Sequence, residues 1–279
     1  MRLSLSVRVA ESPHSKKEAI RSYASVADLA SDTGYQAVCM RASQAGIQTP
    51  LQDIASVHRE TMARSLAVSM VTGDFPIPIN NEHAPDALRN ITPYLDLTEL
   101  LQSDLIRIGM KSDEDIIWAQ RACDEAQERG IRIAHQSHTL SLFETVSGSL
   151  DVLARVGRQN FGIIYEPANL DLCGEDYGKE TLKAFAPHLF NVYLQNHIRR
   201  PGGSISLDTW TRGTVPHDPI KLQDPGGIDF PLLFEGLADI EYSGYVTVHQ
   251  AFTQIMTPED AARESYDYLT GICDFEEVI

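Results

Sequence analysis

Short apolar segments alternate with longer stretches of mixed polarity along the whole chain of 279 residues. Each short segment has five to seven residues and is rich in β-branched side chains, a composition typical of buried strands. We therefore predict eight strands, at residues 3–9, 36–40, 66–71, 105–110, 131–136, 161–166, 189–195 and 245–250.

The stretches between these segments have the periodicity of amphipathic helices. In residues 17–33 and 114–128, apolar side chains recur every three to four positions, which predicts helices with one buried face. Gly34, Gly130 and Gly244 stand just before predicted strands, where a turn favours a residue that can adopt a positive φ. This alternation of helices and strands predicts parallel βα units.

Eight strands at a spacing of about 30 residues predict an α/β fold, a single (β/α)8 TIM barrel over residues 1–279. A doubly wound open sheet is the alternative. Such a sheet usually carries a glycine-rich phosphate loop after its first strand, but AESPHSKK stands there. No P-loop motif occurs either, so we expect no nucleotide cofactor. A long insertion at about 198–230, after strand seven, is expected to cover the active face.

The chain is strongly acidic, with 39 acidic and 23 basic residues and a formal net charge of −16. Such a surface repels phosphate backbones and anionic lipids, so we expect neither a nucleic-acid partner nor a membrane partner. The four cysteines form no CxxC pair, and the N-terminus resembles a strand more than a signal peptide. These features predict reduced thiols and a cytoplasmic location.

Polar residues end four consecutive predicted strands, where a barrel carries its chemistry. Side chains alternate along a strand, so sequence parity sorts these residues into inward and outward sets. His135 falls on the helix side or at the rim. One consistent inward set consists of Gln136, His138, Glu166, Tyr193, Gln195 and His249.

These strand ends and their flanks resemble the xylose isomerase-like barrel superfamily of sugar isomerases and epimerases. The similar stretches are GYQAVCMRA, LIRIG, HQSHTLSLFET, IIYEPANL, NVYLQN and EYSGYVTVHQ. The resemblance implies the barrel fold and a divalent metal held by four residues at the ends of strands five to eight. It also implies two glutamates that move a proton at the carbon beside a carbonyl.

This chain departs from that pattern at all four positions. Gln136 replaces a glutamate, Glu166 an aspartate, Tyr193 a histidine and His249 a glutamate, with Gln195 as the next inward residue. If a metal binds, we expect Gln136, Glu166 and His249 to hold it. An imidazole ligand favours Zn²⁺, Co²⁺, Ni²⁺ or Fe²⁺, although this ligand set is also compatible with Mn²⁺. The alternative is a metal-free pocket of hydrogen-bonded polar residues.

The expected chemistry is proton transfer. Glu166 and His249 are the catalytic candidates, because a carboxylate and an imidazole can each act as a general base. Gln195 is a candidate donor to the substrate carbonyl. The candidates for substrate binding are Arg41, Arg107, His138, Asn169, Tyr193 and Gln195.

Three functions follow from these residues. The first is an isomerase or epimerase that acts on a sugar-like keto compound. The second is a lyase or dehydratase that uses the same enolate on a keto sugar or cyclitol. The third is a non-catalytic sugar-binding barrel or a subunit of a complex. Each has a small sugar-like molecule as its partner and is compatible with a homo-oligomer. The acidic charge argues against the superfamily's DNA repair nucleases.

Overall fold

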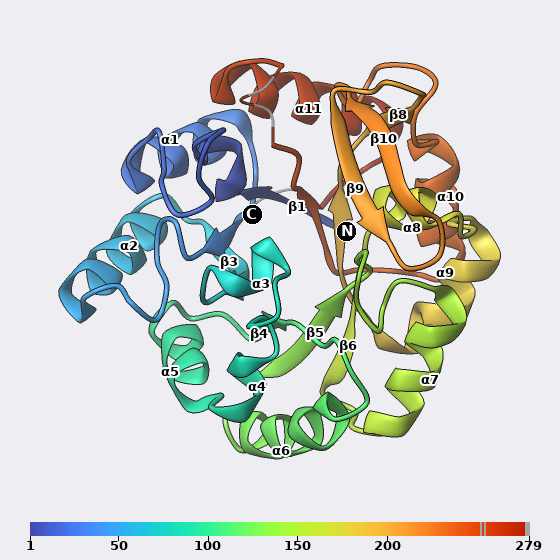
Figure 1. Cartoon of the computed structure of the whole chain (residues 1–279). Helices are drawn as coiled ribbons and strands as arrows, with labels where there is room; N and C mark the ends of the chain where they lie inside the picture. Colours follow the sequence, from blue (N-terminus) through green and yellow to red (C-terminus); the bar gives the residue numbers. More distant parts are fainter. Residues whose placement is uncertain (252, 254, 277–279) are drawn as a thin grey trace.

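Eight parallel strands close into a barrel in the computed structural model, which describes residues 1–251, 253 and 255–276 (Figure 1). Their order around the barrel is β1-β11-β7-β6-β5-β4-β3-β2. Each predicted strand matches one of them, which confirms the (β/α)8 barrel. The strands are β1 (Arg2–Ser6), β2 (Ala37–Arg41), β3 (Ala67–Thr72), β4 (Leu105–Ile108), β5 (Arg132–Gln136), β6 (Phe161–Tyr165), β7 (Leu189–Leu194) and β11 (Tyr245–Val248).

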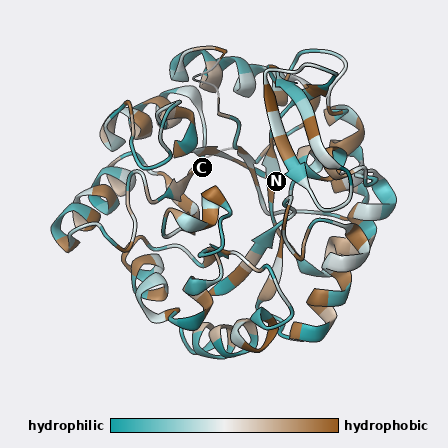
Figure 2. Cartoon of the chain, in the orientation of Figure 1, coloured by the Kyte–Doolittle hydropathy of each residue, from teal (hydrophilic) through white to brown (hydrophobic). Residues whose placement is uncertain are grey.

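Helices surround the barrel and turn their apolar sides towards it. In α6, for example, Ile116, Ala119, Cys123 and Ala126 are buried at intervals of three to four residues. Figure 2 accordingly shows hydrophilic and hydrophobic residues mixed along the outer helices. The helices are α1 (Tyr23–Thr33), α2 (Leu51–Ala63), α3 (Pro76–Ile79), α4 (Asp86–Arg89), α5 (Thr92–Leu100), α6 (Asp115–Glu128), α7 (Val146–Val156), α8 (Pro167–Cys173), α9 (Lys179–Phe185), α10 (Phe230–Asp239) and α11 (Pro258–Ile272).

Two predicted boundaries near the N-terminus were wrong. The first strand ends at Ser6, not at residue 9, and the chain continues into a 3-10 turn, η1 (Val7–Ala10). The first helix begins at Tyr23, not at residue 17, because the Ser22 hydroxyl caps it by accepting from the Ser25 N–H. The loop between η1 and α1 is therefore longer than predicted, and it reaches the mouth of the barrel.

The barrel interior is packed in layers that match the predicted parity. Cys39, Met70, Leu105, Ala134, Ile164 and Tyr193 form one buried cluster across six strands. Side chains two positions further along a strand face the same way, so the next layer lies at the carboxyl ends of the strands. It contains Arg41, Arg107, Gln136, Glu166 and Gln195.

The predicted insertion forms a small antiparallel sheet outside the barrel. Its strands are β8 (His197–Arg199), β9 (Ile205–Thr209) and β10 (Gly213–Pro219), in the order β8-β10-β9. Figure 1 shows β9 and β10 over one side of the barrel opening. We call β8, β9 and β10 the lid sheet. Among the described residues, no helix has the length and apolar character to cross a membrane.

Candidate active site

A cavity of about 450 Å³ opens at the carboxyl ends of the barrel strands. The lid sheet forms part of its wall through residues 205–208. Apolar side chains of Pro78, Ile79, Leu140 and Leu172 contribute another part. The polar wall includes Arg8, Lys16, Arg41, Asn80, Arg107, Gln136, His138, Asn169, Gln195, His197, His217 and His249.

Glu166 lies beneath the floor of this cavity and is fully buried. It follows β6 directly and precedes α8, so backbone geometry fixes its position. Its carboxylate accepts hydrogen bonds from the side-chain amides of Gln136 and Gln195, and from Asn169 Nδ2 at 2.8 Å. Burial raises the pKa of Glu166 to about 7, although Arg8, Gln195 and Arg107 stabilise the charged form. Glu166 therefore titrates near neutral pH.

His249 follows β11 and lies at the cavity floor. Its Nδ1 is 3.1 Å from Ser6 Oγ, and its ring stacks on Tyr193 with centroids 3.8 Å apart. Burial holds the pKa of His249 well below its ordinary value, and the nearby cations Arg8 and Arg41 act in the same direction. The imidazole is therefore neutral at neutral pH, and it serves as a hydrogen-bonding group more readily than as a proton acceptor.

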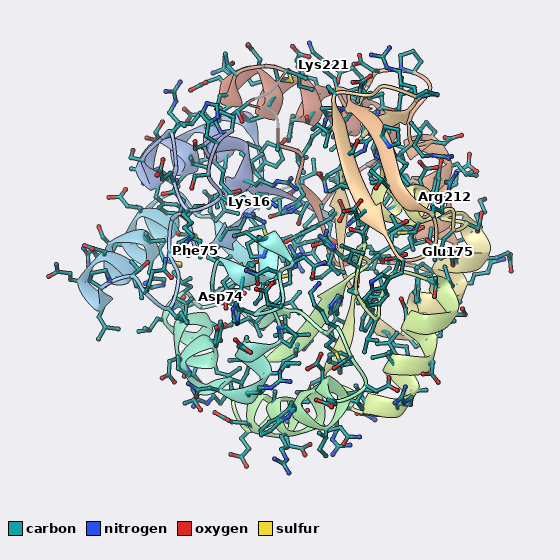
Figure 3. The ribbon with its side chains drawn as sticks, viewed as in Figure 1. Lys16, Asp74, Phe75, Glu175, Arg212 and Lys221 are labelled. Carbon is teal, nitrogen blue, oxygen red and sulfur yellow. The ribbon has the colours of Figure 1, made fainter. Side chains whose placement is uncertain are left out.

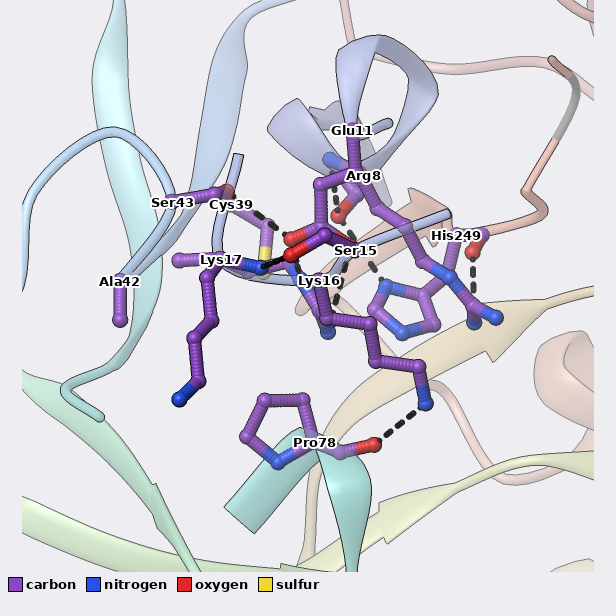
Figure 4. A network of polar contacts seen from close by, with 12 residues as sticks. Arg8, Glu11, Ser15, Lys16, Lys17, Cys39, Ala42, Ser43, Pro78 and His249 are labelled. Carbon is purple, nitrogen blue, oxygen red and sulfur yellow. Dashed lines mark hydrogen bonds and ion pairs between the residues drawn. The ribbon is translucent and has the colours of Figure 1, made fainter. Parts of the chain in front are cut away.

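Four basic side chains line the cavity. Arg41 is fully buried and forms a bidentate salt bridge with Glu11, at 2.6 and 3.0 Å. Arg8 donates through Nη1 to Gln195 Oε1 at 3.0 Å. The same Nη1 donates to the His249 carbonyl at 3.2 Å, a contact that Figure 4 shows. Lys16 donates to the Pro78 carbonyl at 2.7 Å. Figure 3 shows Lys16 over the central opening of the barrel.

Arg107 differs from the other three because its guanidinium forms no hydrogen bond or salt bridge with the residues that the structure describes. Its side chain is 3% exposed, and its buried Nε has no hydrogen-bond partner in the described part of the chain. Burial lowers the pKa of Arg107, and nearby Tyr193 opposes that effect. A guanidinium remains charged even so. The cavity wall thus holds a buried cation that forms no salt bridge with any described residue.

Most of the predicted site residues lie together at this end of the barrel. Gln136, His138, Asn169, Gln195, His249, Arg41 and Arg107 line the cavity. Glu166 lies just behind the wall. Tyr193 lies deeper, under His249, where its hydroxyl contacts Cys39 Sγ at 3.2 Å. Tyr193 thus supports the floor, and a direct substrate contact is not available to it here.

Several polar and aromatic residues near the strand ends lie away from the cavity or bind other partners. His135 turns towards the helices and stacks on Phe143, with ring centroids 4.3 Å apart, as the parity predicted. Lys111 donates to the Leu140 carbonyl, and Arg199 pairs with Asp171. Trp210 is 55% exposed on the lid sheet.

Sequence reasoning missed Arg8 and Lys16. A signal for Arg8 was present, because Ser4, Ser6 and Arg8 occupy alternate positions in an otherwise apolar run. Ser4 and Ser6 do face inward, where they bond Ser69 Oγ and His249 Nδ1. Lys16 carried no such signal, because it lies in an irregular loop immediately before the helix predicted over residues 17–33.

The expected metal ligands Gln136, Glu166 and His249 meet at the floor, but their surroundings do not fit a divalent cation. Three amide groups direct N–H donors at the Glu166 carboxylate. The nearby charged groups that act on it are the guanidinium groups of Arg8, Arg107 and Arg41. Divalent cations favour several anionic or neutral oxygen and nitrogen acceptors. Among the described residues, no group of three or more His, Cys, Asp or Glu is placed to hold a metal.

A closed eight-stranded barrel with polar chemistry at its strand ends defines the general class of this protein. Comparison with known families makes the class specific: the chain belongs to the xylose isomerase-like TIM barrel family, whose model matches residues 27–272. A comparison with curated proteins gave no match.

Similar solved structures share the fold over nearly the whole chain. The probable 3-DHS dehydratase AsbF of Bacillus anthracis is 13% identical with a TM-score of 0.73, covering 97% of this chain and 99% of its own. D-Psicose 3-epimerase of Clostridium cellulolyticum H10, solved with D-tagatose, is 11% identical with a TM-score of 0.69, covering 98% and 99%. A xylose isomerase-like TIM barrel protein of Mycobacterium smegmatis, solved with magnesium, is 12% identical with a TM-score of 0.70. The match covers 97% of this chain and 96% of that protein. These neighbours therefore establish the fold and leave the reaction open.

Proposed function

We propose that this protein is an isomerase or epimerase that moves a proton at the carbon next to a carbonyl in a small sugar-like compound. The observation that carries the proposal is the position of Glu166. A carboxyl group with a pKa of about 7 lies under a cavity of about 450 Å³, in contact with two amides that line it. General bases work best when their pKa is near the working pH.

In the proposed reaction, Glu166 removes the proton from the carbon beside the carbonyl. The electron pair of the broken C–H bond forms the enolate double bond, and the carbonyl oxygen takes the negative charge. Arg107 and Arg8 line the cavity and stabilise that charge. For isomerisation, the hydroxyl on the deprotonated carbon passes its proton to the enolate oxygen and becomes the new carbonyl, and Glu166 returns its proton to the former carbonyl carbon. For epimerisation, a second donor protonates the opposite face of the same carbon, and Glu166 keeps the proton that it removed.

Access to Glu166 requires one local movement. Gln136 and Gln195 separate the carboxylate from the cavity, and both donate to it. Gln195 also accepts from Arg8. A substrate that contacts Arg8 competes for this bond, so we infer that Gln195 turns away when substrate binds and uncovers Glu166.

His249 has a supporting part in this mechanism. Burial lowers the pKa of His249, and the surrounding cations act in the same direction, so the neutral form is favoured. Its imidazole at the floor donates or accepts a hydrogen bond to a substrate hydroxyl or carbonyl. This is the role of an electrophile or an orienting group. Proton removal then depends on Glu166.

A lyase is the second candidate, and Lys16 favours it. Its ammonium lies at the cavity mouth, and loss of water together with the nearby Arg8 and Arg41 lowers the pKa of Lys16. Such a group can donate a proton to a leaving hydroxyl. The same enolate would then lose water in place of being reprotonated.

The test is solvent exchange with wild-type protein. Ketoses, keto acids and keto sugar derivatives are incubated with the enzyme in D₂O and followed by NMR. An isomerase or epimerase incorporates deuterium beside the carbonyl and forms an isomer. A lyase forms an unsaturated product. A panel that shows neither exchange nor product, with ligand binding intact, overturns both proposals and favours a binding protein.

A further inference from the structure

Positive side chains outnumber negative ones around the cavity. Arg41 is neutralised by Glu11. Arg8, Lys16 and Arg107 form no salt bridge with any described residue, and two of them are held only by neutral oxygens. Among the residues that line the cavity, the only carboxylate is that of Asp208, an exposed residue of the lid sheet that accepts from Thr214 Oγ1. Glu166, behind the wall, offsets at most one positive charge.

This local positive charge lies in a chain whose formal net charge is −16. The outer surface therefore supplies many acidic partners to other arginines, for example Arg155 with Asp113 and Asp151. Arg8, Lys16 and Arg107 lack such partners among the described residues. A buried charge without a counter-ion is costly to a folded protein, so its presence calls for a ligand that compensates it.

Arg107 gives the strongest evidence for such a ligand. It comes from β4, the strand next to β5, and it faces the same interior as Gln136. Its guanidinium has a buried and unpartnered Nε. Arg8, beside His249, donates to described residues through Nη1 alone. Planar guanidinium groups of this kind bind carboxylate and phosphate oxygens in pairs.

We propose that the substrate carries an anionic group, a carboxylate or a phosphate, that Arg107 binds together with Arg8 and Lys16. This inference rests on the proposed function, because it names the class of substrate for the same cavity. It also explains the poor fit to a divalent cation, since an anion requires positive groups where a metal requires acceptors. The apolar wall at Ile79 and Leu172 leaves room for the uncharged part of the ligand.

Calorimetric titration of the whole purified protein tests this in a buffer free of phosphate and carboxylates. Matched pairs are compared: D-gluconate with D-glucitol, and D-glucose 6-phosphate with D-glucose, with inorganic phosphate as the simplest probe. We expect the charged member of at least one pair to bind about tenfold tighter or more. The pair with the larger difference in affinity between its charged and neutral members identifies the anion as carboxylate or phosphate. Affinity should also fall as sodium chloride rises.

Two variants make the test specific. Arg107→Met removes the charge and keeps much of the side-chain volume. We expect it to lose the preference for the charged ligand and, without ligand, to melt at a higher temperature than wild type. Arg199→Gln is the matched control, because that arginine lies on the lid sheet and pairs with Asp171 of α8. It should bind the charged ligand as wild type does. If Arg107→Met misfolds, Arg8→Gln provides the same measurement.

Equal binding of charged and neutral members of both pairs overturns the inference, as does an unchanged anion preference in both Arg107→Met and Arg8→Gln. Failure of the proposed function is a separate result. In that case charged ligands bind in an Arg107-dependent manner, but none exchanges deuterium. The binding inference then stands without the reaction.

Discussion

The imidazole of His249 lies flat on the ring of Tyr193, with centroids 3.8 Å apart and planes 15° apart. Tyr193 is fully buried, and its hydroxyl contacts Cys39 Sγ at 3.2 Å, so the lower ring is fixed from beneath. Ser6 Oγ holds the imidazole from one edge. Tyr193 thus positions a group at the cavity floor without reaching the cavity itself.

Because of this stacking, we expect two variants of Tyr193 to differ in kcat and KM. Tyr193→Phe keeps the stacked ring and should keep its turnover. Tyr193→Leu removes the ring, so we expect a higher KM and a kcat lower by about tenfold, from misplacement of His249. Steady-state kinetics on the substrate found by exchange measures both values. Equal kinetics for the two variants would show that the stack does not position His249.

The buried Arg41–Glu11 pair should be important for stability. Glu11→Gln leaves Arg41 as a fully buried cation without its partner, and the loss of one partner in such a pair costs about 3–5 kcal/mol. Urea unfolding monitored by circular dichroism measures the change. Glu259→Gln breaks the exposed pair with Arg21 and should alter stability little. A small effect of Glu11→Gln would mean that Arg41 finds another partner.

Glu166 should make stability depend on pH in a definite direction. Its pKa rises from 4.5 to about 7 on folding, so the folded state keeps the proton over a range where the unfolded chain has lost it. Wild type therefore loses stability relative to Glu166→Gln as pH rises from about 4.5 to about 7, by about 3 kcal/mol in total.

The measurement is the difference in unfolding free energy between wild type and Glu166→Gln across this pH range. At acid pH the variant should be the less stable protein, because its amide nitrogen meets the donors of Gln136 and Asn169. The difference in unfolding free energy between the two proteins should then decrease as pH rises. A gap that is constant from pH 4 to pH 8 would contradict a raised pKa for Glu166.

The charges at the floor also predict the response to chelators. Because guanidinium and amide donors surround Glu166, treatment with EDTA followed by desalting should leave turnover unchanged. Elemental analysis should find substoichiometric transition metal. One equivalent of tightly bound metal, together with loss of turnover in EDTA and recovery on adding metal, would contradict the electrostatic account of this site.

The sequence predicted the barrel well because its strands are buried on both sides. Segments such as 161–166 are apolar throughout and bounded by turn residues, so their length and composition identify them. Parity then placed Gln136 and His249 on the inner side and His135 on the outer side, since alternation is strict within a strand.

The sequence did not predict the environment that decides the chemistry. Lys16 reaches the cavity from an irregular loop, where no periodicity applies. The partners of Arg41 and Arg107 depend on tertiary contacts: Glu11 lies 30 positions from Arg41 and pairs with it, and Arg107 has no comparable carboxylate among the described residues. The raised pKa of Glu166 likewise follows from complete burial, which residue type alone does not indicate.

The central claim is that Glu166 removes the proton beside a substrate carbonyl. The most direct measurement is the rate of deuterium incorporation from D₂O by wild type, Glu166→Gln and the control His135→Asn, across pH 5 to 9. His135 is a buried histidine on a neighbouring strand that faces the helices, so its loss should affect melting and leave exchange intact.

We expect wild-type exchange to rise with pH through an apparent pKa near 7, because the ionised carboxylate is the base. Glu166→Gln should be slower by about 10²–10⁴ at every pH, and His135→Asn should follow wild type. If Glu166→Gln, folded and binding ligand, exchanged deuterium at the wild-type rate, Glu166 would not be the base and the proposed mechanism would be wrong.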